Sequence, residues 1–197
     1  RQGLQGPYQK ECSEAVLAAV LRDAKGADAL KRYAKFALMY LQDQSGIVAL
    51  DKAHELDPKD AETLVLLGEA AARQVEREKS IRAYEKLLPL IGKPLRIGNA
   101  THSIPSTLVR IAAHHAERPD RAKVMATLGR IDLKDTNLDA TTAMSMGGLY
   151  SRIDEVDSSI AAYQRAVELG GRAAYFLGAL YEKKLNYHEA IRWYNRD

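Results

Sequence analysis

The residues best suited to metal chemistry are two adjacent histidines, His114 and His115, followed by Glu117. Neighbouring residues on a helix point about 100° apart, so the two imidazole rings do not converge on one ion. Histidines four residues apart, the spacing used by helical zinc sites, do not occur. The single cysteine, Cys12, cannot form an internal disulfide or a thiolate site. The sequence therefore predicts no metal site and no cofactor.

Two further motifs could in principle bind phosphate or transfer protons. The pairs Gly147–Gly148 and Gly170–Gly171 lack the Gly-x-Gly-x-x-Gly or Gly-Lys-Ser/Thr pattern that binds phosphate. The acidic residues Asp154, Glu155 and Asp157 lie at an expected turn, where carboxylates cap the next helix. Because both motifs have structural explanations, we predict no catalytic residues and no enzymatic activity.

The composition favours helices that pack closely. The 197 residues include 30 alanines, and 10 tyrosines against only 2 phenylalanines and 1 tryptophan. Alanine is the best helix former, whereas strands prefer β-branched and aromatic residues in alternation. The 29 basic and 26 acidic residues give a net charge of +3 and are scattered along the chain, which argues against nucleic-acid binding. No apolar run reaches the ~18 residues of a membrane span.

Three segments of the sequence align with one another, at residues 62–88, 141–167 and 172–197. Each contains a glycine, at Gly68, Gly147 and Gly178, and a small residue twelve positions later. A tyrosine follows sixteen positions after each glycine. This spacing predicts two antiparallel helices that approach closely at the glycine. Each helix pair leaves one apolar face uncovered, so several pairs must stack in a line.

The pattern resembles the tetratricopeptide repeat (TPR), which has a Leu-Gly, Tyr, Ala, Tyr order over about 34 residues. The last segment carries it as Leu177-Gly178, Tyr181, Ala190 and Tyr194. Glu168–Gly171 and Ala190–Tyr194 are similar to the Sel1-like subclass. The resemblance implies an all-α fold, a right-handed superhelical solenoid of antiparallel helix pairs.

We expect one such solenoid over residues 1–197, with about five helix pairs. Residues 1–26 would be a partial N-terminal unit, and residues 106–131 a degenerate pair without the glycine. Residues 89–105, which contain three prolines and two glycines, would form an inserted loop. Because a solenoid end usually carries a polar capping helix, we interpret the chain as a fragment of a longer protein or as one whose end is covered by a partner.

The resemblance also implies where a partner would bind, since the first helix of each pair lines the concave side. The predicted groove residues are Lys31, Lys35, Val65, Glu69, Thr107, Ile111, His114, Met144, Tyr175 and Glu182. Apolar residues such as Val65 and Ile111 favour an apolar, extended or helical segment over a carboxylate clamp. The alternative is that these side chains only pack against neighbouring helices.

The predicted function is a non-enzymatic scaffold that binds a protein or peptide through this groove or through the 89–105 loop. By fold-level analogy, a bacterial periplasmic assembly or polysaccharide-export complex is favoured over the cytoplasm. The alternatives are a docking or regulatory domain of a larger enzyme, an intracellular co-chaperone or adaptor, and a polysaccharide binder using Tyr175, Phe176 and Trp193. The partner, the compartment and the oligomeric state are open at this point.

Overall fold

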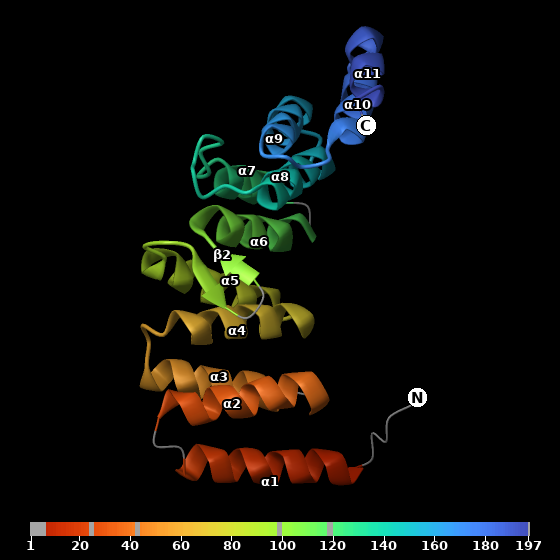
Figure 1. Ribbon diagram of the computed structural model, residues 1–197. Helices are drawn as coiled ribbons and strands as arrows, with labels where there is room; N and C mark the ends of the chain where they lie inside the picture. The colour runs from red at the N-terminus through yellow and green to blue at the C-terminus, as the bar shows by residue number, and fades with distance from the viewer. Residues whose placement is uncertain (1–6, 24–25, 42–43, 98–99, 118–119, 197) are drawn as a thin grey trace. The chain divides into compact units, whose positions relative to one another are not determined.

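The structure is a computed structural model that describes residues 7–23, 26–41, 44–97, 100–117 and 120–196 (Figure 1). These residues are mainly α-helical, which confirms the predicted fold class. The chain divides into two compact units, Arg1–Leu90 and Ile91–Asp197. The boundary falls inside the segment expected to interrupt the array. A single continuous solenoid stays a prediction, and each unit is described by itself below.

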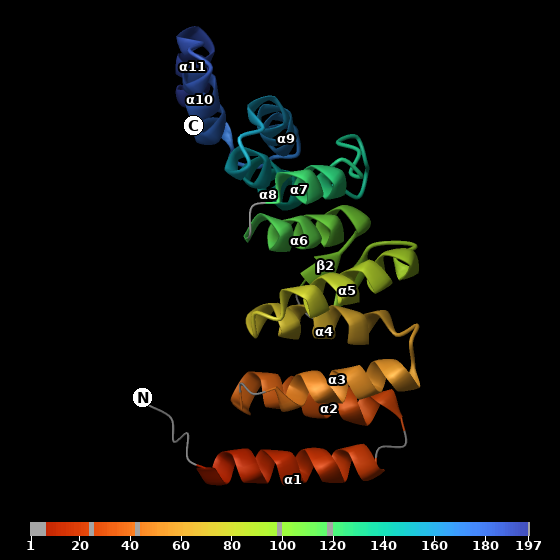
Figure 2. The same ribbon diagram turned by 180° about the vertical axis from the view of Figure 1, so that it is seen from behind.

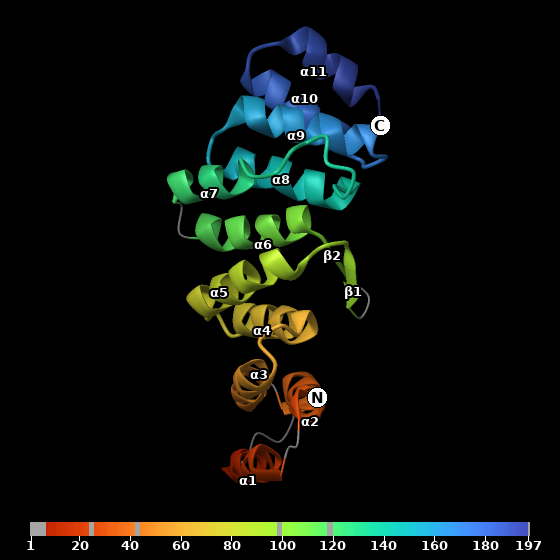
Figure 3. The ribbon, with the colours of Figure 1, turned by 90° about the vertical axis from the view of Figure 1, so that its left-hand side faces the viewer.

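The first unit is built from helices α1 to α5 and two short irregular helices. Helices α2 and α3 form one pair and α4 and α5 another, while α1 lies against α2 and α3 (Figures 1 and 3). The bounds are α1 (Pro7–Asp23), α2 (Ala27–Phe36), the π-helical turn η1 (Ala37–Leu41), α3 (Ser45–Leu56), α4 (Ala61–Arg73), α5 (Arg77–Leu87) and the 3-10 turn η2 (Leu88–Leu90).

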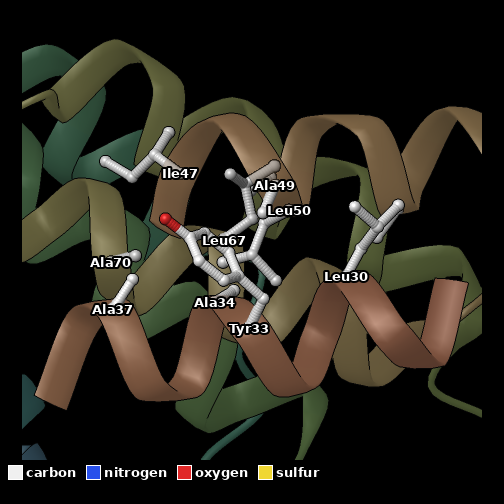
Figure 4. Close-up of a cluster of buried hydrophobic side chains, with 11 residues drawn as sticks. Leu30, Tyr33, Ala34, Ala37, Ile47, Ala49, Leu50, Leu67 and Ala70 are labelled. Carbon is white, nitrogen blue, oxygen red and sulfur yellow. The ribbon is translucent and has the colours of Figure 1, made fainter. Parts of the chain in front are cut away.

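A cluster of small and branched side chains forms the core of the first unit (Figure 4). Leu30, Tyr33 and Ala34 of α2 face Leu50 of α3, and Ala70 of α4 closes the cluster. All five are buried. Alanines at these contacts let the helix backbones approach closely. The close helix packing that the alanine-rich composition predicts is therefore present in this core.

The second unit begins with a short antiparallel β-hairpin and continues with three helix pairs, α6–α7, α8–α9 and α10–α11 (Figure 2). The bounds are β1 (Leu95–Ile97), β2 (Ala100–His102), α6 (Ile104–Glu117), α7 (Arg121–Leu128), α8 (Ala140–Arg152), α9 (Val156–Glu168), α10 (Ala174–Lys183) and α11 (Tyr187–Tyr194). The degenerate pair expected over residues 106–131 is therefore present as α6 and α7.

The 89–105 segment is more regular than the predicted loop. It contains the last two residues of η2, both strands and the start of α6 (Figure 3). Leu95 pairs with His102 and Ile97 with Ala100 across the hairpin. Pro105 lies in the first turn of α6, where a proline has no hydrogen bond to lose. The prolines interrupt the helices but leave room for a hairpin between them.

The repeated glycines lie where the two helices of a pair touch. A Cβ atom added to Gly68 would lie 2.6 Å from the Tyr84 ring, and one added to Gly147 would lie 2.7 Å from the Tyr163 ring. The Tyr194 ring covers Gly178 in the same way. Each tyrosine therefore packs on the glycine sixteen residues before it. The predicted close approach is confirmed at all three glycines.

In two of the three repeats, the small residue twelve positions after the glycine is a serine that joins the two helices by a buried hydrogen bond, whereas the third repeat has Ala190 there. The Ser80 hydroxyl donates to the Gly68 carbonyl at 2.8 Å, and the Ser159 hydroxyl donates to the Gly147 carbonyl at 2.8 Å. The turn between the helices is also repeated, because Val75, Asp154 and Leu185 all adopt left-handed backbone angles, with φ of 63°, 64° and 58°. One local geometry thus recurs in α4–α5, α8–α9 and α10–α11.

The predicted capping of α9 by the acidic turn residues is only partly confirmed: Asp157 lies in the first turn of α9, where a carboxylate faces the positive helix end, but no capping hydrogen bond forms. Glu155 stands at the N-cap of α9, but its side chain makes no capping hydrogen bond. Asp154 and Asp157 form ion pairs with Lys183, the last residue of α10, and Lys184, the residue that follows it. Carboxylates do cap three other helices: the side chains of Asp60, Asp120 and Asp139 accept from the amides of Glu62, Lys123 and Thr142. The carboxylates at 154 and 157 thus connect neighbouring helix pairs.

Candidate partner-binding site

An apolar pocket of about 240 Å³ opens in the first unit, between the α2–η1 segment and α4. Its floor is formed by Ala34, Leu50 and Ala70, which belong to the buried core. Leu38 and Leu66 form half-buried walls. The rim is formed by Lys35, Met39, Glu69 and Arg73. The arrangement can accept an apolar side chain while charged groups contact its surroundings.

The π-helical turn η1 shapes one side of this pocket. The turn continues α2 directly and presents Met39, whose side chain is 66% exposed. Helix α3 packs closely against η1 at Gly46, where an added Cβ would lie 2.8 Å from the Leu38 side chain. Isolated π-turns are rare and are frequent at functional sites. A flexible thioether at the rim also suits binding of varied side chains.

Ion pairs hold the two groove lysines of the first unit. The Lys31 amine lies 2.8 Å from Asp60 Oδ2, 3.0 Å from Glu62 Oε2 and 3.0 Å from Asp28 Oδ1. Burial lowers the pKa of Lys31, but the bonds to these carboxylates outweigh it and raise that pKa above its ordinary value. Lys35 binds Glu62 at 2.7 Å. Both ammonium groups are already paired with carboxylates of this chain, which argues against a carboxylate clamp.

The carboxylates of this network are correspondingly held in their charged forms. The pKa of Glu62 is lowered by hydrogen bonds from Lys35 and Lys31. Burial raises the pKa of Asp60, but the bonds from Lys31 and Thr63 reverse this effect, so the pKa lies below its ordinary value.

Arg73, at the rim of the pocket, differs from Lys31 and Lys35 because it has no ion-pair partner among the described residues. Arg73 is therefore the cation that the pocket can offer to a ligand.

The four predicted groove residues of the first unit fall into three classes. Lys35 and Glu69 line the pocket. Lys31 lies in the ion-pair network beside it. Val65 is buried in the packed face of α4, so its side chain cannot contact a ligand on the surface of the folded chain. For Val65, the alternative of packing against neighbouring helices is the one that the structure shows.

The predicted residues of the second unit are also divided between core and surface. Thr107 and Ile111 are fully buried in α6, which corrects their assignment to an accessible groove. The cause is that an inner position is covered wherever neighbouring first helices pack closely. His114 and Met144 are half-buried, and Tyr175 and Glu182 are exposed. These lie on α6, α8 and α10.

Sequence reasoning missed Met39 and Arg73. Each lies four residues, about one helical turn, after a predicted groove residue: Met39 follows Lys35 and Arg73 follows Glu69. A signal for Met39 is present, since residues 36–41 form six consecutive apolar residues. A helix with one buried face cannot bury six consecutive apolar residues. Some residues of this run must therefore face outward, or the helix must depart from regular α-helical geometry.

The histidines of the second unit do not form a metal site among the described residues. His114 Nδ1 lies 3.6 Å from Glu117 Oε1, three residues further along α6. His102 is buried at the end of β2. Within the part of the chain that the structure describes, no helix combines the length and the apolar character needed to cross a bilayer.

No family model and no curated protein matches the sequence. Several solved structures are similar in fold. A MamA structure has a TM-score of 0.67 at 18% identity, covering 86% of this chain and 88% of that one. MamA from Desulfovibrio magneticus RS-1 has a TM-score of 0.59 at 17% identity, covering 88% and 93%. YrrB, described as a TPR protein with an unusual peptide-binding site, has a TM-score of 0.62 at 16% identity, covering 92% and 89%.

The repeat geometry inside this chain and the similarity to solved structures indicate the same fold independently. The recurring glycine, tyrosine and left-handed turn define one helix-pair geometry inside this chain. The similar structures are TPR proteins. The Sel1-like features of the last segment stay a prediction. The chain therefore has the helix-pair fold of the tetratricopeptide-repeat proteins.

Proposed function

We propose that the chain is a non-enzymatic interaction domain and that its first unit binds a segment of a protein partner at the pocket beside η1. The observation that carries this proposal is an open apolar pocket next to a π-turn, with Met39 at its rim and with Arg73, which has no ion-pair partner in the part of the chain that the structure describes. Among the described residues, most other predicted inner positions are buried in the core or paired with an opposite charge. The pocket, by contrast, is open and is not filled by a side chain of this unit.

The pocket defines the chemistry of the bound segment. Leu38, Leu66 and Met39 favour one apolar side chain of the partner, which would leave water on binding. Arg73 favours a carboxylate close to that side chain, because guanidinium and carboxylate groups form paired hydrogen bonds. The bound segment is therefore an apolar residue with an acidic neighbour. Peptide binding by the similar YrrB structure supports this class of ligand.

A peptide-selection experiment tests the proposal. Random peptides displayed on phage are selected against the chain, and the enriched peptides are titrated by fluorescence anisotropy. We expect enrichment of an apolar residue next to Asp or Glu. Met39→Glu places a charge at the rim and should weaken binding about tenfold, equivalent to about 1.4 kcal/mol.

Val48→Glu is the matched control. Val48 is also an exposed apolar residue of the first unit, at 45%, but it lies on α3 outside the pocket. This variant should bind the selected peptides as the wild type does. Equal weakening by both substitutions, or enriched peptides without an apolar residue, would contradict the proposal.

The polysaccharide alternative is less well supported by the aromatic side chains. Phe176 stacks on Tyr163 with ring centroids 5.1 Å apart and an interplanar angle of 7°, so one face of Phe176 is occupied. Trp193 is contacted by the guanidinium of Arg196 at 5.0 Å. A periplasmic or polysaccharide-export setting, a role as the docking part of an enzyme and an intracellular adaptor role stay predictions from fold-level analogy.

A further inference from the structure

A second pocket, of about 190 Å³, lies between α3 and α5 and differs from the first in its charge. Its polar lining comes from one face of each helix, with Asp51 and His54 on α3 and Lys79, Arg82 and Lys86 on α5. Residues three, four and seven positions apart share a helix face, so the three cations of α5 point to the same side. Leu67 and Ala83 supply its apolar lining.

Only part of this positive charge is balanced. Lys79 binds Asp51 at 2.9 Å and Glu76 at 3.4 Å. Arg82 donates through Nε to the Glu78 carbonyl of its own helix at 3.2 Å and has no carboxylate partner among the described residues. The Lys86 amine contacts His54 Nε2 at 3.0 Å. Within the described part of the chain, two cations of the pocket, Arg82 and Lys86, therefore form no ion pair with a carboxylate.

The contact between Lys86 and His54 fixes the protonation of the imidazole. An ammonium group can only donate, so His54 Nε2 must accept and the ring is neutral with its proton on Nδ1. His54 Nδ1 is buried without a hydrogen-bond partner. Burial and the charge of Lys86 both lower the pKa of His54. The ring is thus held in a form that leaves one buried donor unsatisfied.

We propose that this pocket binds an oxyanion group, a phosphate or a carboxylate, between Arg82, Lys86 and His54. The anion accepts hydrogen bonds from the guanidinium and the ammonium. It also replaces the Lys86 contact at His54 Nε2, so that Nε2 can carry a proton and donate to the anion. Because a protonated imidazole adds a positive charge and a donor at Nε2, binding favours the protonated ring and tightens as the pH falls. The groups that face His54 from the two helices and the following turn are Asp51, Glu55, Asp57, Lys79, Arg82 and Lys86.

The imidazole resonances of His54 test the proposal directly. The chain has 5 histidines, and His54→Gln assigns the resonances. In chloride, we expect a His54 pKa below the ordinary value and an unprotonated Nε2. Sulfate, whose charge is constant through the titration, should raise the His54 pKa by about one pH unit at equal ionic strength, as a nearby opposite charge does. A Glu-rich peptide forms a second arm, which distinguishes a carboxylate on a protein from a small free anion.

Two variants should remove this response. Lys86→Gln raises the His54 pKa by removing a cation, but adding sulfate or peptide should then change it little. Arg82→Gln should also reduce the response. Lys59→Gln removes the same charge from an exposed position outside the pocket and should respond as the wild type.

A response to sulfate, to the peptide or to both supports the site and identifies its ligand class. If His54 responds to neither, or if Lys86→Gln and Arg82→Gln respond as strongly as the wild type, the proposal is wrong.

Discussion

The helix pairs α8–α9 and α2–α3 have the same fold but differ in how completely they close. In α8–α9, the Tyr163 ring covers Gly147 and the Ser159 hydroxyl joins the two helices. In α2–α3, the Leu38 side chain covers Gly46, and the first helix ends in a π-turn. The apolar pocket opens beside that π-turn. The difference teaches that the complete repeat pattern stabilises a helix pair, whereas a departure from it can create a binding surface.

The largest expected effect is on the closed pair. Gly147→Leu would place a side chain where even a Cβ lies 2.7 Å from the Tyr163 ring. Because the buried ring cannot move freely, we expect the free energy of unfolding to fall by about 3 kcal/mol, measured by urea denaturation. Gly148→Leu is the matched control: Gly148 is exposed on the same helix, and its added Cβ would lie 3.5 Å from the tyrosine hydroxyl. Equal losses in both variants would show that helix contact at Gly147 is not the cause.

Removal of Lys31 should have the next largest effect, and it acts beside the open pair. Lys31→Gln leaves Asp60 and Glu62 close together without their shared cation. We expect a loss of about 1–2 kcal/mol at neutral pH, because these groups are only partly buried. Arg32→Gln, at the next and exposed position of α2, is the control and should have little effect.

The acid dependence of stability should change in the same variant. In the wild type, the folded pKa values of Asp60 and Glu62 are depressed. Their contribution is thus present above their unfolded values of about 4 and is lost as the pH falls through the folded values. In Lys31→Gln this acid-side loss should become smaller. Urea denaturation at a series of pH values from neutral to acidic measures the free energy of unfolding. The same dependence of this free energy on pH in Lys31→Gln and the wild type would contradict the role given to these ion pairs.

A smaller effect is expected from the hydrogen bond that joins the closed pair. Ser159→Ala removes the donor to the Gly147 carbonyl and should lower the free energy of unfolding by about 1 kcal/mol. Ser80→Ala removes the equivalent bond in α4–α5 and should cost a similar amount. Ser151→Ala, at an exposed position of α8, should cost little. A cost for Ser151 equal to that for Ser159 would show that the bond does not stabilise the pair.

The sequence predicted the helix pairs because their markers are local. Gly147, Ser159 and Tyr163 lie within one segment, so their spacing records a contact between adjacent helices. The accessibility of a side chain depends on contacts with a further helix pair, which local spacing does not record. The family pattern therefore predicts that Val65 and Ile111 line a groove, although both side chains are buried.

Other features depend on geometry that residue types do not specify. The π-turn directly follows α2 and lies against α3 at Gly46, which no residue pattern marks. The hairpin of β1 and β2 occupies a proline-rich segment without an alternating pattern. Arg73 belongs to the site only because η1 lies opposite α4.

Methionine methyl NMR tests the central claim most directly. The 4 methionines include Met39 at the pocket rim and Met144 at a predicted groove position of the second unit. On titration with a selected peptide, the account predicts that the Met39 methyl resonance shifts and saturates while that of Met144 stays in place. A shift of Met144 with an unmoved Met39 would contradict it.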